Sequence, residues 1–178
     1  MTSYKIDQTH SNIAFSVRHL VISRVRGRFT HFAGTIDLDD KDITKSKVTA
    51  EIAAGSIHTN DETRDGHLRS ADFLDAESSP IIKFASTSIE RKGERLYVTG
   101  GLTIRGVTKD VVLAVEELGT TKDPYGNDRV AFAASTTIDR TSFGLKWNQA
   151  LETGGVLVGE KIEVDFDIQA IKAKALAA

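Results

Sequence analysis

The chain has 178 residues, of which 40% are hydrophobic and 27% are charged, and its formal net charge is −2. This length is enough for one well-buried domain, and the lack of a basic excess argues against nucleic acid as a partner, because such binding needs a positive surface. Cysteine is absent, which excludes disulfides, thiolate metal sites and a cysteine nucleophile. Only two prolines occur and the fourteen glycines are scattered, so we expect a single domain over residues 1–178.

The first residues, MTSYKIDQTHS, contain neither a charged n-region nor an apolar run. No signal peptide is therefore visible, and we expect a cytoplasmic protein, or a periplasmic one if a leader was removed. No stretch approaches the roughly 18 apolar residues of a membrane-spanning helix, so we do not expect the chain to span a membrane.

The dominant pattern is an alternation of apolar and polar residues, which is typical of strands that are solvated on one face. It first appears at Ile13, Phe15 and Val17. The pattern predicts about eight strands, at residues 12–18, 29–38, 48–54, 81–89, 96–104, 107–115, 130–138 and 161–169.

Short connections join these strands. Arg105 and Gly106 predict a two-residue hairpin turn, and the DPYGN segment at 123–127 predicts a looser turn. Between Phe29 and Phe32 the apolar period slips by one residue. A β-bulge is the simplest way to keep both rings on one side of the sheet.

A helical segment interrupts the strand pattern near residue 60. Thr59 and Glu62 fit a capping box, which predicts a short helix that Gly66 weakens. Ser70 then indicates a second brief helical turn, which Pro80 ends.

This helical segment carries a cluster of charges within TRDGHLRSADF. Arg64, His67 and Arg69 are candidates for a cationic rim around a ligand. The alternative is a surface ion-pair network in which Asp65 and Asp72 hold the arginines as scaffold.

An antiparallel sheet of about eight strands must be covered by another layer or closed on itself. The sequence offers little helix to cover it, so we expect an all-β fold: a single closed antiparallel barrel with one or two short helices. Ala50, Gly100 and Ala134 share the inward register with larger residues. These small residues leave an elongated apolar pocket, unless small and large side chains interdigitate and fill the barrel.

Six stretches carry a resemblance to a known family: DQTHSNIAFSVRHL at 7–20, VRGRFTHFAGTI at 25–36, IHTNDETRDGHLRSADFLD at 57–75, PIIKFAS at 80–86, LTIRGVTKDVVL at 102–113 and IDRTSFGL at 138–145. In this order they resemble the YceI family of polyisoprenoid-binding proteins, from about Tyr4 to Ile171. The resemblance implies a lipocalin-like barrel that encloses a long isoprenoid or similar amphiphile, often as a homodimer. Many relatives carry a secretion leader, whereas this chain shows none.

The inward register and the charged segments give the candidate ligand contacts. The apolar candidates are Phe15, Val17, Phe29, Phe32, Ile36, Ile52, Phe84, Leu102, Phe132, Ala134 and Ile138, with Phe143 and Trp147 after the DRTSFG segment. Each of them is equally suited to an ordinary core position. His19, Arg64, His67 and Arg69 are the polar candidates for a head group, and Arg18, Arg105, Arg140 and Lys146 are further cations that are available. Five singly scattered histidines give no metal-ligand spacing, and we expect no cofactor.

We therefore expect a protein that binds, and transports or stores, a long-chain hydrophobic amphiphile such as a polyisoprenoid, a prenyl quinone or a fatty acid derivative. One alternative is a filled barrel that acts as a structural or protein-interaction module. The other is an enzyme that acts on a prenyl or acyl substrate. We expect no enzyme, because the chain contains no GxSxG, HExxH or glycine-rich phosphate loop.

Overall fold

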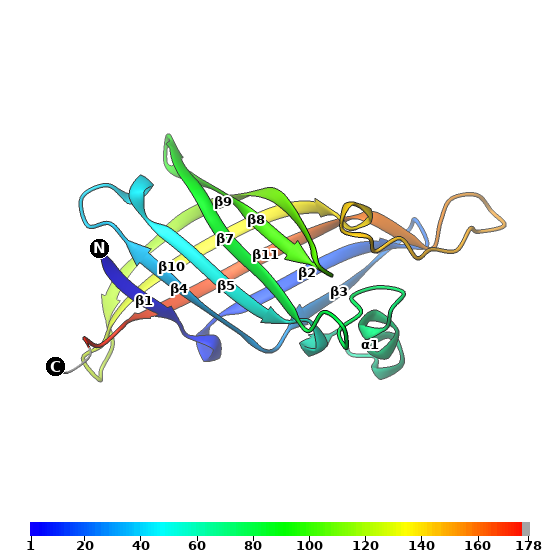
Figure 1. The fold of residues 1–178 in the computed structure, drawn as a ribbon, viewed down its shortest axis with the longest axis horizontal. Helices are drawn as coiled ribbons and strands as arrows, with labels where there is room; N and C mark the ends of the chain where they lie inside the picture. Colours follow the sequence, from blue (N-terminus) through cyan, green and yellow to red (C-terminus); the bar gives the residue numbers. More distant parts are fainter. Residues whose placement is uncertain (176–178) are drawn as a thin grey trace.

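Long antiparallel strands wind around one axis in the computed structural model, which describes residues 1–175 (Figure 1). The strands are β1 (Thr2–Ile6), β2 (Asn12–His19), β3 (Ser23–Phe29), β4 (Phe32–Leu38), β5 (Lys47–Ala53), β6 (Ile57–His58), β7 (Ile81–Lys92), β8 (Arg95–Ile104), β9 (Val107–Lys122), β10 (Asp128–Asp139) and β11 (Val158–Lys172). The α-helix is α1 (Glu62–Arg69), and the short 3-10 helices are η1 (Gln8–His10), η2 (Ile43–Lys45), η3 (Ala54–Ser56) and η4 (Arg140–Phe143).

The sheet closes into a barrel. Its strand order runs β1-β4-β5-β7-β8-β9-β10-β11, and β1 pairs in turn with β11. The remaining strands extend this ring beyond short interruptions, because β2 pairs with β11, β3 with β2, and β6 with β3. The prediction of an all-β, lipocalin-like closed barrel with a short helix is confirmed.

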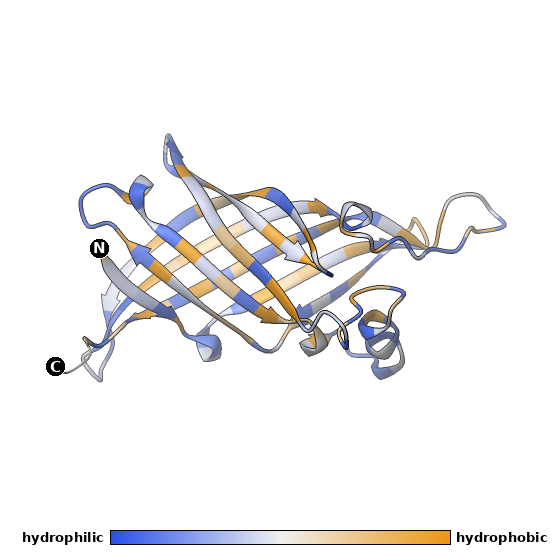
Figure 2. Ribbon diagram, viewed as in Figure 1, coloured by the Kyte–Doolittle hydropathy of each residue, from blue (hydrophilic) through white to orange (hydrophobic). Residues whose placement is uncertain are grey.

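Apolar and polar residues alternate along the strands, as Figure 2 shows. Successive side chains on a strand point to opposite faces, so this alternation sends the apolar set inward. Figure 1 shows α1 at one end of the barrel and the N-terminus with the end of β11 at the other. Buried apolar residues occupy the interior near both ends, including Phe73 and Phe143 near α1 and Ile36 and Val130 at the opposite end.

The predicted β-bulge between Phe29 and Phe32 is wrong. β3 ends at Phe29 and β4 begins at Phe32, and the Thr30 amide between them donates to the Ser56 carbonyl at 3.1 Å. The neighbouring strands break at the same level, with η1 between β1 and β2 and η3 between β5 and β6. A bulge of one residue bends a single strand and cannot bend three adjacent strands together. The chain is therefore interrupted in all three, between β1 and β2, between β3 and β4, and between β5 and β6.

The predicted capping box is also wrong in its first residue. The N-cap of α1 is Asp61, whose carboxylate accepts from the Arg64 amide at 3.0 Å. Thr59 instead donates its hydroxyl to the Asp65 carboxylate at 2.6 Å. The brief turn expected after Ser70 is present, because residues 71–74 form a turn in which the Phe73 amide donates to the Ser70 carbonyl at 3.0 Å.

The two predicted turns are confirmed. Arg105 and Gly106 both have positive φ angles, 51° and 74°, as a type I′ hairpin turn requires. Asp123 organises the second turn by accepting from the amides of Tyr125 and Asn127, both at 2.9 Å.

Arg129 joins the N-terminal segment to the β9–β10 turn. Its guanidinium lies 2.8 Å from the Asp7 carboxylate and 2.9 Å from that of Asp123. Burial alone would raise the pKa of Asp7, but hydrogen bonds from Thr9, Arg129 and His10 outweigh it and lower that pKa. Hydrogen bonds from Asn127 and then Arg129 lower the pKa of Asp123.

These depressed pKa values predict how stability depends on pH. Both carboxyls are more acidic in the folded chain than in the unfolded one, so their stabilisation is complete above the ordinary aspartate pKa of about 4 and is lost as the pH falls further. Arg129→Met should lower the thermal midpoint at neutral pH and flatten its dependence on pH in the acid range. Circular dichroism melts across pH 2–8 measure both effects. The control is Arg91→Met, since Arg91 forms an exposed ion pair with Glu117; an equal flattening in this control contradicts the prediction.

Candidate functional site

An internal cavity of about 270 Å³ lies along the barrel axis. Its wall is apolar, and the polar residues that line it are Ser46, Thr136 and Arg140. The Ser46 hydroxyl accepts from the Asp39 amide, and the Thr136 hydroxyl donates to the Val112 carbonyl, both at 2.9 Å. These two hydroxyls are therefore engaged in structural hydrogen bonds.

Most of the apolar residues predicted to face inward lie on the wall of this cavity. They are Phe15, Val17, Phe29, Phe32, Ile36, Ile52, Phe84, Leu102, Phe132, Ala134, Ile138 and Phe143. They come from strands on all sides of the barrel and from η4.

The small inward-facing residues leave open volume at some positions, whereas aromatic rings fill the space beside them at others. A Cβ on Gly100 would lie 2.5 Å from the ring of Phe84, and one on Gly27 would lie 2.4 Å from the ring of Phe15. Aromatic rings therefore occupy the space beside both glycines. Ala50 and Ala134 line the cavity itself. The expectation of open volume thus fits the two alanines, whereas at Gly100 the large and small residues interdigitate.

Both ends of the cavity are lined by side chains from loops and short helices. Leu68 of α1, Phe73, Leu74 and Leu145 line the α1 end. Ile43 of η2 lines the opposite end. The sequence indicated Leu145, which follows the DRTSFG segment, as a wall or end residue, but it gave no such indication for Leu68, Phe73, Leu74 and Ile43, because they lie outside the alternating strands.

The α1 end is held by an aromatic cluster. The ring of His67 meets Phe73 at 5.0 Å and Trp147 at 4.6 Å between centroids, in both cases edge to face. His67 Nε2 also lies 2.8 Å from the Asp72 carboxylate. Trp147 packs against the core beside these residues but does not line the cavity.

The other predicted polar contacts lie away from the cavity wall. Arg64 donates from Nε to the Thr59 hydroxyl and from Nη2 to the Thr59 carbonyl, both at 2.7 Å. Arg69 donates to the Gly55 carbonyl at 3.0 Å, and its guanidinium lies 3.3 Å from Glu62. His19 ends β2 opposite Ser23. Arg64 and Arg69 therefore fasten α1 to its neighbouring segments, while His19 lies on a separate strand end.

Asp65 anchors α1, although not as the predicted partner of the arginines. The residue is fully buried, and its Oδ1 accepts from both the amide and the hydroxyl of Thr59, at 2.9 and 2.6 Å. Its Oδ2 has no hydrogen-bond partner within residues 1–175, and His58 Nδ1 lies 3.5 Å away. The predicted scaffold of Asp65 and Asp72 holding the arginines is wrong, because Thr59 and His67 take those carboxylates.

Arg140 is the cation that lines the cavity, and sequence reasoning named it only as available. It is 4% exposed and donates to the carbonyls of Leu145, Trp147, Val158 and Gly159 at 2.7 to 3.2 Å. Burial lowers the pKa of its guanidinium, and the charges of Glu160 and Asp139 oppose that effect. Asp139 caps η4, in which Arg140 is the first residue and is buried.

Within residues 1–175, no group of three His, Asp or Glu side chains lies close enough together to hold a metal ion. No helix in this part of the chain is both long and apolar enough to cross a membrane.

Comparisons with known proteins give a consistent family. A family model described as the YceI-like domain matches residues 4–170. A UPF0312 protein of Staphylococcus epidermidis is 40% identical over 166 residues, covering 93% of this chain and 95% of its own length. A UPF0312 protein of Staphylococcus aureus is 37% identical with the same coverage.

Solved structures share the fold. The Campylobacter jejuni YCEI protein is 30% identical with a TM-score of 0.75, covering 88% of this chain and 90% of its own. Burkholderia cenocepacia BcnA is 20% identical with a TM-score of 0.81, covering 92% and 98%. A polyisoprenoid binding domain from Saccharophagus degradans is 17% identical with a TM-score of 0.69, covering 97% and 100%. On the family match over residues 4–170 and the relatives at 37–40% identity, this chain belongs to the YceI-like family.

Proposed function

We propose that this protein binds a hydrophobic amphiphile inside the barrel and acts as a carrier or store for it. The observation that carries the proposal is the apolar cavity of about 270 Å³, whose wall is formed by side chains from around the whole barrel. The description of the Saccharophagus degradans neighbour as a polyisoprenoid binding domain supports an isoprenoid-like ligand. The wall residues named above are the proposed contacts with the apolar tail.

The composition of the cavity wall favours a carrier over an enzyme. A hydrolytic or transfer site needs a nucleophile and a base within hydrogen-bond reach. The hydroxyls of Ser46 and Thr136 on this wall are engaged with backbone groups, and the guanidinium of Arg140 is engaged with carbonyls. None of these three side chains is placed next to a general base on the cavity wall.

The size of the cavity limits how much of a ligand it encloses. A cavity of about 150 Å³ accepts benzene, so one of 270 Å³ suits roughly ten carbon atoms, or about two prenyl units. At about 0.8 kcal/mol per CH₂, burying them contributes at most about 8 kcal/mol before the costs of association. A longer tail must therefore displace wall side chains or extend beyond the cavity.

The test is to identify what the protein carries in its own cells. Protein purified from its natural source should release a long-chain amphiphile in stoichiometric amount on extraction with organic solvent, and native mass spectrometry should show the same mass bound. The emptied protein should then take up retinol, an uncharged prenol whose fluorescence reports binding. An empty extract together with no retinol uptake contradicts the proposal.

A homodimer and a cytoplasmic location both stay predictions. Sedimentation of the purified protein tests the first, and fractionation of the source cells tests the second.

A further inference from the structure

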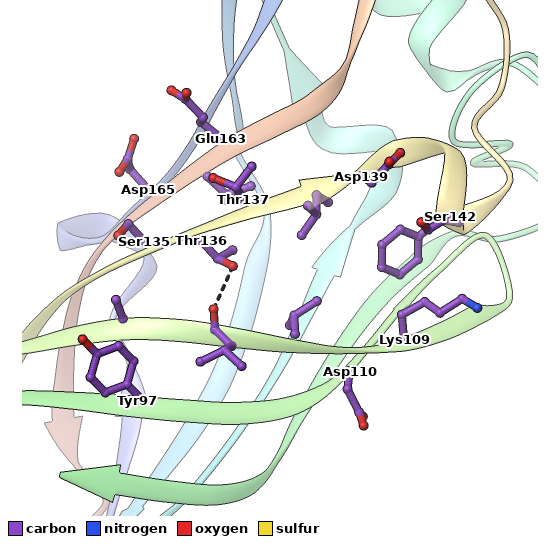
Figure 3. Close-up of a pocket in the computed structure, with 16 residues that line it drawn as sticks. Tyr97, Lys109, Asp110, Ser135, Thr136, Thr137, Asp139, Ser142, Glu163 and Asp165 are labelled. Atoms are coloured by element: carbon purple, nitrogen blue, oxygen red, sulfur yellow. Dashed lines mark hydrogen bonds between the residues drawn. The ribbon is translucent and has the colours of Figure 1, made fainter. Parts of the chain in front are cut away.

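The barrel wall is split between β9 and β10. Their ladder runs from the pair Lys122 and Asp128 as far as Ala114 and Ser135. Both strands continue beyond that point, where β9 pairs with β8 and β10 pairs with β11, but no longer with each other. The Thr136 hydroxyl reaches across to the Val112 carbonyl at 2.9 Å, in place of a backbone bond (Figure 3).

An outer crevice of about 820 Å³ lies over this split. Its lining includes outward-facing residues and also five residues that line the internal cavity: Val111, Thr136, Ile138, Phe143 and Val164. In an intact sheet, inward side chains are covered by the backbone ladder and cannot be reached from outside. The shared residues therefore show that the apolar interior and the outer surface meet at the split.

The outer margin of the crevice is polar. The crevice is lined by Ser135, Thr137 and Asp139 on β10, by Glu163 and Asp165 on β11, and by Lys109 and Asp110 on β9, all of which Figure 3 labels. Four carboxylates (Asp110, Asp139, Glu163 and Asp165) therefore line the crevice with one lysine, Lys109.

The negative charge of this margin is centred on Asp110 and Asp165, which form no ion pair within residues 1–175, while Lys109 and Arg18 offset part of the total. Arg24 lies 2.6 Å from Glu163 and Lys161 lies 3.7 Å from Asp139, so two of the four carboxylates are paired. Arg24 lowers the pKa of Glu163, and the Thr141 hydrogen bond lowers that of Asp139, so both stay ionised at neutral pH. Carboxylates accept hydrogen bonds from an uncharged alcohol but repel a phosphate or a carboxylate, whereas the hydroxyls can bond to either kind of head group.

We propose that the split between β9 and β10 is a lateral portal, through which the apolar tail enters the cavity while an uncharged, hydroxyl-bearing head group stays in the outer crevice. The proposal rests on the proposed function and adds the route and the head-group class. Phe73, Leu74 and Leu145, all buried, line one end of the cavity and half-buried Ile43 lines the other, whereas at the split residues of the apolar wall also line the outer crevice. A portal at the split also lets part of a ligand that is longer than the cavity project into solvent.

A reversible bridge across the split tests the route. Continuing the ladder register would set Val112 opposite Thr137, and both line the crevice. Because the chain has no cysteine, Val112→Cys/Thr137→Cys can be joined by a short bis-methanethiosulfonate reagent and released by reduction. The control is Thr49→Cys/Ala85→Cys, a bridge between two exposed positions on strands that are already paired, away from both the cavity and the crevice.

Stopped-flow fluorescence then measures how fast each protein binds and releases retinol. Bridging the split should slow both rates at least about tenfold, with recovery on reduction and no change in the control. Unchanged rates across the bridged split, or equal slowing in the control, overturn the portal. If the unbridged protein binds no retinol, the proposed function itself fails and the portal fails with it.

Retinoic acid tests the head-group class, because it has the same tail as retinol and an anionic head. At low salt the affinity for retinol should be about tenfold higher than that for retinoic acid. Asp110→Asn/Asp165→Asn should reduce this ratio of affinities. Equal or tighter binding of retinoic acid by the unaltered protein overturns the uncharged head group, even where the bridging result supports the route.

Discussion

Ala134→Trp is expected to abolish retinol binding while the barrel stays folded. Ala134 lies in the middle of β10, opposite Val115 on β9 and Phe166 on β11, and its side chain lines the cavity. An indole adds about nine ring atoms, which is close to the roughly ten carbon atoms that the cavity admits. The new side chain should therefore take the ligand's place, and retinol titration should show a loss of affinity of about a hundredfold or more.

The neighbouring residue provides a matched control. Ala133 is opposite Glu116 and Asp167, on the outer face of the same strand, so Ala133→Trp should leave both binding and folding unchanged. If the barrel is instead filled by its own side chains, Ala134→Trp overpacks it and costs about 1 to 3 kcal/mol or more in urea unfolding. A folded Ala134→Trp variant that binds retinol as well as the unaltered protein contradicts the placement of the ligand.

The sequence predicted the cavity wall well because the physical rule is local. Along β10, Phe132, Ala134 and Ile138 face inward for the same reason that Ala133 faces outward, since side chains alternate with a period of two. The turn at Arg105 and Gly106 could be predicted from equally local information. Closure of the sheet into a barrel could also be predicted, because about eight strands that are apolar on one face, with little helix to cover them, have few other ways to bury that face.

Strand breaks and caps could not be predicted as reliably, because two local solutions compete there. The slip between Phe29 and Phe32 has the same sequence signature for a bulge and for a break, and the choice depends on η1 and η3 in the neighbouring strands. Thr59 and Asp61 both suit an N-cap. Asp61 takes that position because buried Asp65 engages the hydroxyl of Thr59.

The charged residues were the hardest to place. Arg64, Arg69 and Arg140 are alike in sequence, yet each guanidinium is held by carbonyl oxygens that come from folding. A backbone carbonyl carries no sequence signature, so nothing in the order of residues separates a free surface arginine from one that fastens a loop. Only the structure places Arg140 on the cavity wall.

Arg140→Met is expected to loosen the segment between η4 and β11 and to destabilise the barrel by at least about 3 kcal/mol, because hydrogen bonds from a charged donor contribute about 1.5 to 3 kcal/mol each. The substitution removes the donor shared by four carbonyls, which include those of Leu145 and Trp147. Trp147 is the single tryptophan of the chain, so its emission reports this end of the barrel alone. Its emission should shift to the red at urea concentrations where far-ultraviolet circular dichroism still shows an intact sheet.

Arg105→Met is the matched control for Arg140→Met. Arg105 also donates to two carbonyls, those of Ala71 and Phe73 at 2.6 and 2.9 Å, but it is only half-buried and lies beyond the cavity wall. Water can replace its donors, so its loss should cost clearly less, and the Trp147 emission should shift together with the circular dichroism signal. If Arg140→Met unfolds in one coincident transition with a loss no larger than that of Arg105→Met, then the barrel end is held by packing of Phe143 and Leu145 and not by the guanidinium.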